Sequence, residues 1–386
     1  MASRGVRPLI AARAVNQLGA FSLAFLTVLL TRQLGASLAA AGAVSAAFGL
    51  ATIPSRLIGG RLADRLGRRR TILLGLLGCA AAQLGIAAAR SLVVAAGCAV
   101  LLGFAFELYE PPSQAFIADA VLPDERADTY SLLTTALAAG NFGAGLIAAL
   151  VGRGSLRWLF LVDAASCLAC ALIVLLALPA DRGRPTTTVD AAVPALKPWR
   201  DRALLAVTAA GTVFALVYML MLVSLPLSLA ADGLNPAAAG LIMAVSTLTL
   251  VVARPVLHRI PRIGELPAGA AFAAGYSLMA VGLAGYSVAD TLPALLAPTA
   301  AWSIGNLLLM GRAFAVVTGL APEGATARYL AVYGLSWGFA TVAAPLLATW
   351  LIARNGPATL WAAMALVCLG MAVAQPRLVH RLPVRA

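Results

Sequence analysis

Long apolar runs follow one another along the whole chain, and short polar connectors separate them. A helix needs about 20 apolar residues, at a rise of about 1.5 Å each, to cross the hydrocarbon core of a bilayer. The pattern therefore predicts an all-α membrane protein. Its twelve predicted transmembrane helices lie at roughly residues 8–31, 37–60, 71–89, 92–118, 127–151, 156–179, 203–230, 236–257, 264–285, 290–312, 327–352 and 356–375.

One longer polar stretch divides these runs into two groups of six. It contains proline, glycine and three consecutive threonines, which is typical of a linker. A short repeat favours duplication, because residues 122–126 before the fifth span resemble residues 321–323 before the eleventh. We therefore expect two pseudo-symmetric six-helix bundles, at 1–180 and 203–386, joined by a cytoplasmic linker at 181–202.

Composition agrees with a membrane protein and excludes several other classes. Hydrophobic residues make up 61% of the chain and charged residues 11%, which leaves too little polar surface for a water-soluble globule. The net charge of +13 does not indicate nucleic-acid binding, because the basic residues fall in connectors between apolar spans. The sequence contains neither a P-loop nor a nucleophile elbow, so we do not expect an enzyme.

Cysteine and histidine give no sign of a metal site or a cofactor. All five cysteines lie in apolar spans, and the CxxC pair Cys167 and Cys170 has no adjacent basic or acidic helper. We interpret it as helix packing. The two histidines, His258 and His380, lie in separate basic stretches.

Basic residues predict the orientation in the membrane. The positive-inside rule is satisfied when both termini are cytoplasmic, because most of the 28 arginine and lysine residues then lie inside. No cleavable signal peptide is apparent before the first span. The outer connectors then hold Arg32, Arg90, Arg153, Arg157 and Arg354, and the spans hold Arg13 and Arg56.

The connector between the second and third spans has the highest local charge. Residues 60–70 hold five arginines and one aspartate between two apolar runs. Asp64 and Arg68 are four residues apart, within reach of an ion pair if the segment stays helical. Gly60 permits close helix approach and Gly67 allows a turn.

Two carboxylates lie inside the fourth span. Glu107, Glu110 and Gln114 are spaced so that they share one face of a continuous helix. Intramembrane acids are functional candidates, because they must pair, take up a proton or face water. Burial and a neighbouring carboxylate both favour the protonated form, so we expect Glu110, and less firmly Glu107, to hold a coupling proton. The alternative is that one of them pairs structurally with Arg13 or Arg56 and never titrates.

These features resemble the major facilitator superfamily, and specifically its bacterial drug and metabolite efflux branch. The branch has an acidic residue before two prolines in helix four, matched by residues 110–112, although the helix-five glycine motif at residues 140–145 lacks its proline. The family motif between helices two and three is matched by Gly60, Leu62, Ala63, Asp64, Arg65, Gly67, Arg68 and Arg69.

The resemblance implies roles for residues far apart in the sequence. It implies a cytoplasmic gate in which Asp119, at the end of helix four, joins Gly60, Asp64, Gly67 and Arg68. It also implies a central solute cavity lined by helices one, four, seven and ten. The candidate cavity residues are Arg13, Asn16, Gln17, Gln114, Tyr218, Met219, Trp302, Ser303, Asn306 and Met310.

The sequence thus predicts a secondary transporter that exports a small amphipathic organic solute in exchange for protons. An uptake symporter or facilitator, and a receptor-like protein of the same fold, are the alternatives. We expect a monomer in the bacterial plasma membrane, with lipid around it, a small-molecule solute, no nucleic acid and no cofactor besides the proton. Asp163, near the outer end of the sixth span, is interpreted as solvated rather than as a gate residue.

Overall fold

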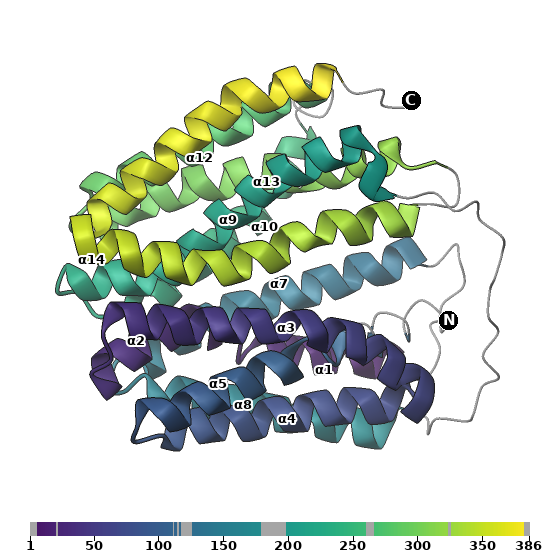
Figure 1. Cartoon of the computed structure of the whole chain (residues 1–386), viewed down its shortest axis with the longest axis vertical. Helices are drawn as coiled ribbons and strands as arrows, with labels where there is room; N and C mark the ends of the chain where they lie inside the picture. Colours follow the sequence, from purple (N-terminus) through teal and green to yellow (C-terminus); the bar gives the residue numbers. More distant parts are fainter. Residues whose placement is uncertain are drawn as a thin grey trace. The chain divides into compact units, whose positions relative to one another are not determined.

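Helices account for nearly all of the described chain (Figure 1). The structure is a computed structural model that describes residues 6–20, 22–110, 112–113, 116, 126–178, 198–259, 266–322 and 326–381. Its α-helices are α1 (Val6–Gln17), α2 (Ser22–Leu34), α3 (Leu38–Leu66), α4 (Arg68–Ala88), α5 (Leu92–Phe106), α7 (Arg126–Val151), α8 (Arg157–Ala177), α9 (Arg202–Ala231), α10 (Ala238–Arg259), α12 (Ala268–Val288), α13 (Leu296–Leu320) and α14 (Thr326–His380). Two short 3₁₀ helices, η1 (Pro198–Arg200) and η2 (Pro293–Leu295), precede α9 and α13.

Small polar side chains set where several helices begin. The Ser37 hydroxyl accepts a hydrogen bond from the Ala40 amide at 3.2 Å, and Ser91 accepts one from Val94 at 3.4 Å. Asp201 likewise accepts a hydrogen bond from the Ala203 amide at the start of α9, at 2.8 Å. These acceptors satisfy amides that have no partner within the first turn of a helix.

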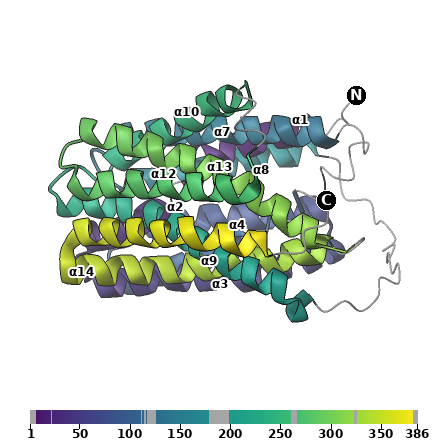
Figure 2. The same ribbon diagram turned by 90° about the horizontal axis from the view of Figure 1, so that it is seen from above.

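Within the described residues, nine helices are long and apolar enough to cross a membrane. One of them, α14, contains Gly356 at φ +79°, and there the chain reverses so that α14 forms two spans (Figures 1 and 2). Helix pair α1 and α2 and the shorter α5 occupy the first and fourth predicted spans. Helices thus occupy all twelve predicted spans, and the prediction of an all-α membrane fold is confirmed.

Two of the predicted spans are interrupted. The first is not one helix, because α1 ends at Gln17 and α2 begins at Ser22. The fourth is α5, which ends at Phe106 and is followed by a turn at residues 107–109. The prediction of continuous helices was wrong at both places, and both breaks border the site described below.

The structure separates into two compact units. Unit 1 comprises Met1–Thr187 and Leu222–Ala244, and unit 2 comprises Thr188–Met221 and Val245–Ala386. In unit 1, α4 packs against α5 and α8, and α1 packs against α7 and α8. In unit 2, α12 packs against α13 and α14. Compact units are not sequence repeats, so the division at 181–202 stays a prediction.

Large apolar side chains are both buried and exposed, as a bilayer requires. Phe25, Phe48 and Phe160 are fully buried in unit 1, and Phe272 is in unit 2. Many other large apolar side chains are exposed along the helices, as on a surface that contacts lipid tails.

Close packing of α3 on α5 depends on Gly103. A methyl group added there would overlap the Phe48 carbonyl oxygen. We expect Gly103→Ala to lower stability by about 1–3 kcal/mol, because overpacking forces helices apart. Gly97→Ala is the control, because a Cβ on that glycine of the same helix meets nothing within 4 Å. Thermal unfolding in detergent measures both variants, and equal midpoints would contradict this packing.

Candidate functional site

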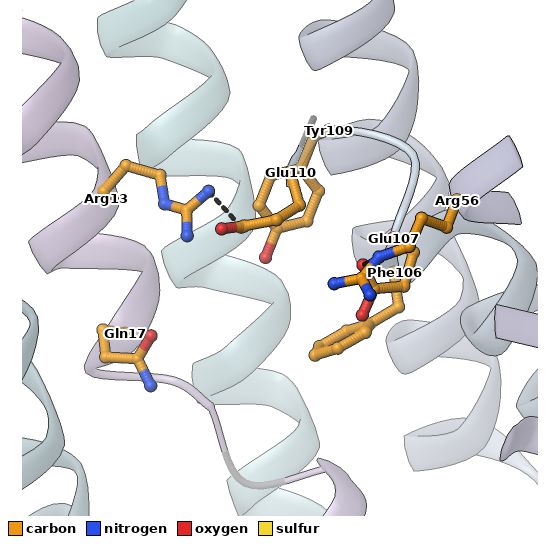
Figure 3. Close-up of a pocket in the computed structure, with 7 residues that line it drawn as sticks. All are labelled: Arg13, Gln17, Arg56, Phe106, Glu107, Tyr109 and Glu110. Carbon is orange, nitrogen blue, oxygen red and sulfur yellow. Dashed lines mark hydrogen bonds and ion pairs between the residues drawn. The ribbon is translucent and has the colours of Figure 1, made fainter. Parts of the chain in front are cut away.

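A polar cavity of about 250 Å³ lies in unit 1, beside the turn that follows α5. Figure 3 shows charged side chains from α1, α3 and this turn around it. The lining residues are Arg13, Gln17, Arg56, Phe106, Glu107, Tyr109 and Glu110. The sequence predicted four of these, namely Arg13, Gln17, Glu107 and Glu110.

Each glutamate of the cavity pairs with an arginine from another helix. Glu110 forms an ion pair with Arg13 of α1 (Figure 3). Glu107 Oε2 lies 3.1 Å from Arg56 Nε of α3. The sequence allowed one glutamate to pair with Arg13 or Arg56, and the structure shows both glutamates paired.

The two pairs differ in exposure. The Arg13 and Glu110 side chains are 11% and 27% exposed, whereas Arg56 is 55% exposed and Glu107 is 21% exposed. Charges near water interact weakly, and charges in a low-dielectric environment interact strongly. The pair between Arg13 and Glu110 is therefore the one whose loss should matter more.

The backbone after α5 explains how both glutamates reach the cavity. The helix ends at Phe106, so Glu107 and Glu110 do not share a face of one continuous helix, as the sequence had suggested. Proline has no amide hydrogen, and it disfavours helical geometry in the residue before it. The prolines at 111 and 112 lack the amide hydrogens that would bond the carbonyls of residues 107 and 108 in a continuous helix, which favours the break at the turn 107–109. Gln114 lies outside the described residues.

A buried hydrogen-bond network lies behind the cavity. The Tyr109 hydroxyl donates to Asn16 Oδ1 at 2.9 Å, and Asn16 Nδ2 donates to Cys167 Sγ at 3.2 Å. The Arg13 guanidinium lies 5.3 Å from the centre of the Tyr109 ring. Tyr109 therefore contacts Arg13 and Asn16, two of the three α1 residues that the sequence had placed in the cavity. Sequence analysis missed Tyr109, which lies between the two glutamates.

Gln17 has a separate partner. Its Nε2 donates to Asn141 Oδ1 of α7 at 2.6 Å. This hydrogen bond joins the end of α1 to the glycine-rich part of α7, where a Cβ on Gly140 would lie 2.7 Å from the Gln17 Cβ. The helix-five glycine series thus brings α7 close to the cavity wall.

Tyr109→Phe tests the network. The change removes the hydroxyl but keeps the ring beside Arg13, and it leaves the buried Asn16 oxygen without this donor. We expect a loss of about 1–3 kcal/mol in stability, the usual effect of an unsatisfied buried polar group. Thermal unfolding in detergent measures it. An unchanged midpoint would show that the hydrogen bond contributes nothing.

Asp163 differs from its prediction. The interpretation as a solvated helix end was wrong, because Asp163 is 4% exposed and lies within α8. Cys167 Sγ lies 3.9 Å from Asp163 Oδ1, which places the carboxyl at the far side of the network. The prediction relied on the position of Asp163 near the end of its span. In the structure, the break between α1 and α2 packs over this part of α8, so that a Cβ on Gly19 would lie 2.6 Å from Asp163 Cα.

Unit 2 holds the other candidate cavity residues, and three of its helices contribute a cluster of aromatic rings. The Tyr218 ring of α9 lies 5.6 Å from Trp302 of α13 and 5.4 Å from Trp337 of α14, measured between ring centres. Phe214 lies 6.1 Å from Trp337. The sequence predicted Tyr218 and Trp302 and missed Trp337 and Phe214, which become neighbours only through helix packing.

The remaining candidates in unit 2 have different surroundings. Ser303 donates to the Thr299 carbonyl at 2.7 Å, and its hydroxyl lies 2.7 Å from that of Ser246, so it packs α13 against α10. Asn306 is buried, Met219 is half-buried and Met310 is exposed. Among these residues, Asn306 is the buried one whose side-chain oxygen has no hydrogen-bond partner in the described part of the chain, as expected of a residue that binds a solute.

The charged connector turns at Gly67, between α3 and α4. Gly67 has φ +93°, and Arg68 begins the next helix. The chain is therefore not one continuous helix from Asp64 to Arg68, so the condition for helical spacing of these two residues is not met, and Gly67 makes the turn that its residue type allows. The surroundings of Gly60, the side chain of Asp64 and all of Asp119 lie outside what the structure describes. Arg69 donates to the Leu175 carbonyl in the last turn of α8, so it joins α4 to α8.

Comparison with known sequences gives one consistent result. The family model of the Major Facilitator Superfamily matches residues 9–340. An MFS-type transporter of Bacillus subtilis, YhjO, is 27% identical over 91% of this chain and 86% of its own length. The multidrug resistance protein MdtH of Aeromonas hydrophila is 27% identical over 84% of this chain and 77% of its own length.

Solved structures agree on the architecture. A peptide transporter of the POT family superposes with a TM-score of 0.78 at 17% identity, and covers 98% of this chain and 95% of that one. The nucleoside transporter NupG superposes with a TM-score of 0.81 at 12% identity, over 97% of this chain and 99% of that one. At such identities the likeness concerns the fold.

Proposed function

Because the chain belongs to the major facilitator superfamily, we propose that it is a secondary transporter that exports a small amphipathic organic solute in exchange for protons. One observation supports proton exchange above all. Two glutamates and two arginines surround a cavity inside a helical unit of a multi-pass membrane protein. Such charges are expensive in an apolar environment, and they are usual where ions or protons are transported.

Proton exchange follows from the chemistry of the pairs. A proton on Glu110 removes the charge that holds Arg13, so the ion pair weakens and the guanidinium becomes available to other partners. Loss of the proton restores the pair. The two states differ in cavity charge, which gives the protein a means to couple proton binding to its conformation.

The efflux direction is supported by sequence relatives rather than by geometry. The MdtH proteins of Aeromonas hydrophila and Aeromonas salmonicida are named multidrug resistance proteins, at 27% and 26% identity. We propose the same class of activity here. No cofactor takes part in this proposal beyond the proton, and the chain acts as a monomer in the bacterial plasma membrane with both termini in the cytoplasm.

The charged connector is proposed as the cytoplasmic gate. Asp64 and Arg68 flank the turn at Gly67, and Asp119 supplies a second carboxylate. An interaction that forms in only one conformation favours that conformation, and it needs no contact with the solute. Gly60 allows α3 to approach its neighbours in that state.

Transport in proteoliposomes tests the direction of coupling. Vesicles are loaded with a labelled compound from a panel of lipophilic cations and neutral aromatic compounds, and a pH step is applied across the membrane. Exchange predicts that solute leaves when protons are driven in. Solute that moves in the same direction as protons would make the protein a symporter, and movement that ignores the pH step would make it a facilitator.

A further inference from the structure

We propose that the face of α13 that holds Trp302 and Asn306 recognises a neutral, planar aromatic solute with a hydrogen-bond acceptor beside a donor. A cyclic amide fused to an aromatic ring is the simplest such solute. The inference names the solute class of the proposed transporter and rests on that function. Its binding test, however, needs no transport.

Two buried polar atoms point to a ligand. Trp302 Nε1 and Asn306 Oδ1 have no hydrogen-bond partner among the described residues, although the two side chains are only 6% and 5% exposed. Buried polar groups in proteins nearly always have a partner, because an unsatisfied one is destabilising. One of the two atoms is a donor and the other an acceptor, so a single solute edge that offers the opposite pair satisfies both.

The two residues face the same way. They are four residues apart on α13, which places their side chains on one face of the helix, about 5–6 Å apart at Cβ. Side chains on one face can contact the same edge of a ligand, such as the carbonyl and the amide N–H of a lactam. The carbonyl would accept from Trp302, and the N–H would donate to Asn306.

Aromatic rings form the surroundings of this pair. The planes of Tyr218 and Trp302 are inclined by 31°, and Trp337 stands at 73° to Tyr218. Flat rings stack on such faces with a gain beyond simple burial. The cluster thus favours a planar solute over a branched aliphatic one.

The lack of acidic side chains in these helices favours a neutral solute over a cation at this site. Neither aspartate nor glutamate occurs in α9, α10, α12, α13 or α14. A buried cation needs a counter-charge, and aromatic faces alone compensate only part of its lost hydration. The carboxylates of the cavity in unit 1 are already paired with arginines.

The test compares three probes of nearly equal shape on the purified full-length protein in detergent, by isothermal titration calorimetry. 2-Quinolone offers acceptor and donor, N-methyl-2-quinolone lacks the donor, and N-methylquinolinium is a cation with neither. We expect 2-quinolone to bind at least about tenfold more tightly than either of the others, because each of them leaves a buried polar atom unsatisfied. Equal affinities, or tightest binding of the cation, would overturn the proposal.

Variants assign the two contacts. Asn306→Leu should remove the preference for 2-quinolone over its N-methyl form, and Trp302→Phe should weaken both lactams by a similar factor of about ten. Trp361→Phe is the control, because Trp361 is also buried in unit 2 and stacks on Tyr286, 5.1 Å away. A preference that survives Asn306→Leu would contradict the assignment.

The outcomes distinguish this inference from the proposed function. Selective binding without proton-coupled movement would keep the site and remove the transport mechanism. Proton-coupled export of cations without binding of 2-quinolone would keep the transport mechanism and remove the proposed site. If a variant fails to fold, the ranking of the three probes on the unaltered protein still decides the matter.

Discussion

Glu110→Gln is expected to abolish solute movement driven by a pH gradient and to leave exchange of labelled for unlabelled solute intact. Glutamine has nearly the same shape and can still accept a hydrogen bond from Arg13, but it cannot release a proton. We therefore expect the rate under a pH gradient to fall to the rate at equal pH, because the variant has no proton to exchange for solute. Proteoliposomes with an imposed pH step measure driven movement, and equal pH on both sides isolates exchange.

Two matched variants make this result specific. Glu107→Gln should have the weaker effect, because its partner Arg56 is half exposed to solvent. Asp290→Asn should have none, because Asp290 is exposed in the connector after α12. If Glu107→Gln alone abolished the driven rate, the coupling proton would belong to Glu107 instead.

Arg13→Gln is expected to impair both stability and transport, and Glu110→Gln in the same chain to restore stability alone. Removal of Arg13 leaves the Glu110 carboxylate without its cation in a side chain only 27% exposed. We expect a loss of about 1–3 kcal/mol, less than for a fully buried pair because the Glu110 side chain is partly exposed. The double variant replaces the pair by two neutral amides, which removes the uncompensated charge.

Unfolding in detergent and driven transport are measured on the same four proteins: wild type, both single variants and the double variant. We expect the double variant to lose less free energy of unfolding than the sum of the losses in the two single variants. Additive losses would show that the ion pair between Arg13 and Glu110 does not act as a unit. Recovery of driven transport in the double variant would mean that neither group holds the proton.

The length of apolar runs predicted the transmembrane helices well, because crossing a bilayer imposes one length on every span. The breaks at residues 18–20 and 107–109 were not predicted. Apolar length does not show where the backbone leaves a helix, although the prolines at 111 and 112 were a signal for the second break. Gly356 was likewise the signal for the reversal within α14.

The residues of the site were predicted in part, and their partners were left open. Intramembrane charge marked Arg13, Arg56, Glu107 and Glu110, because such charges are rare in apolar spans. Which arginine pairs with which glutamate depends on helix packing across long sequence separations, and the sequence allowed either pairing. Asp163 was misplaced for the same reason, because its burial comes from the segment after α1.

The most direct test of proton exchange at Glu110 measures proton and solute flux together in one vesicle preparation. A gradient of the solute found in the transport panel is imposed at equal pH, and a pH-sensitive dye inside the vesicles reports proton movement. Wild type should move protons opposite to solute, and Glu110→Gln should pass solute without moving protons. Proton movement that persists unchanged in Glu110→Gln would contradict the account.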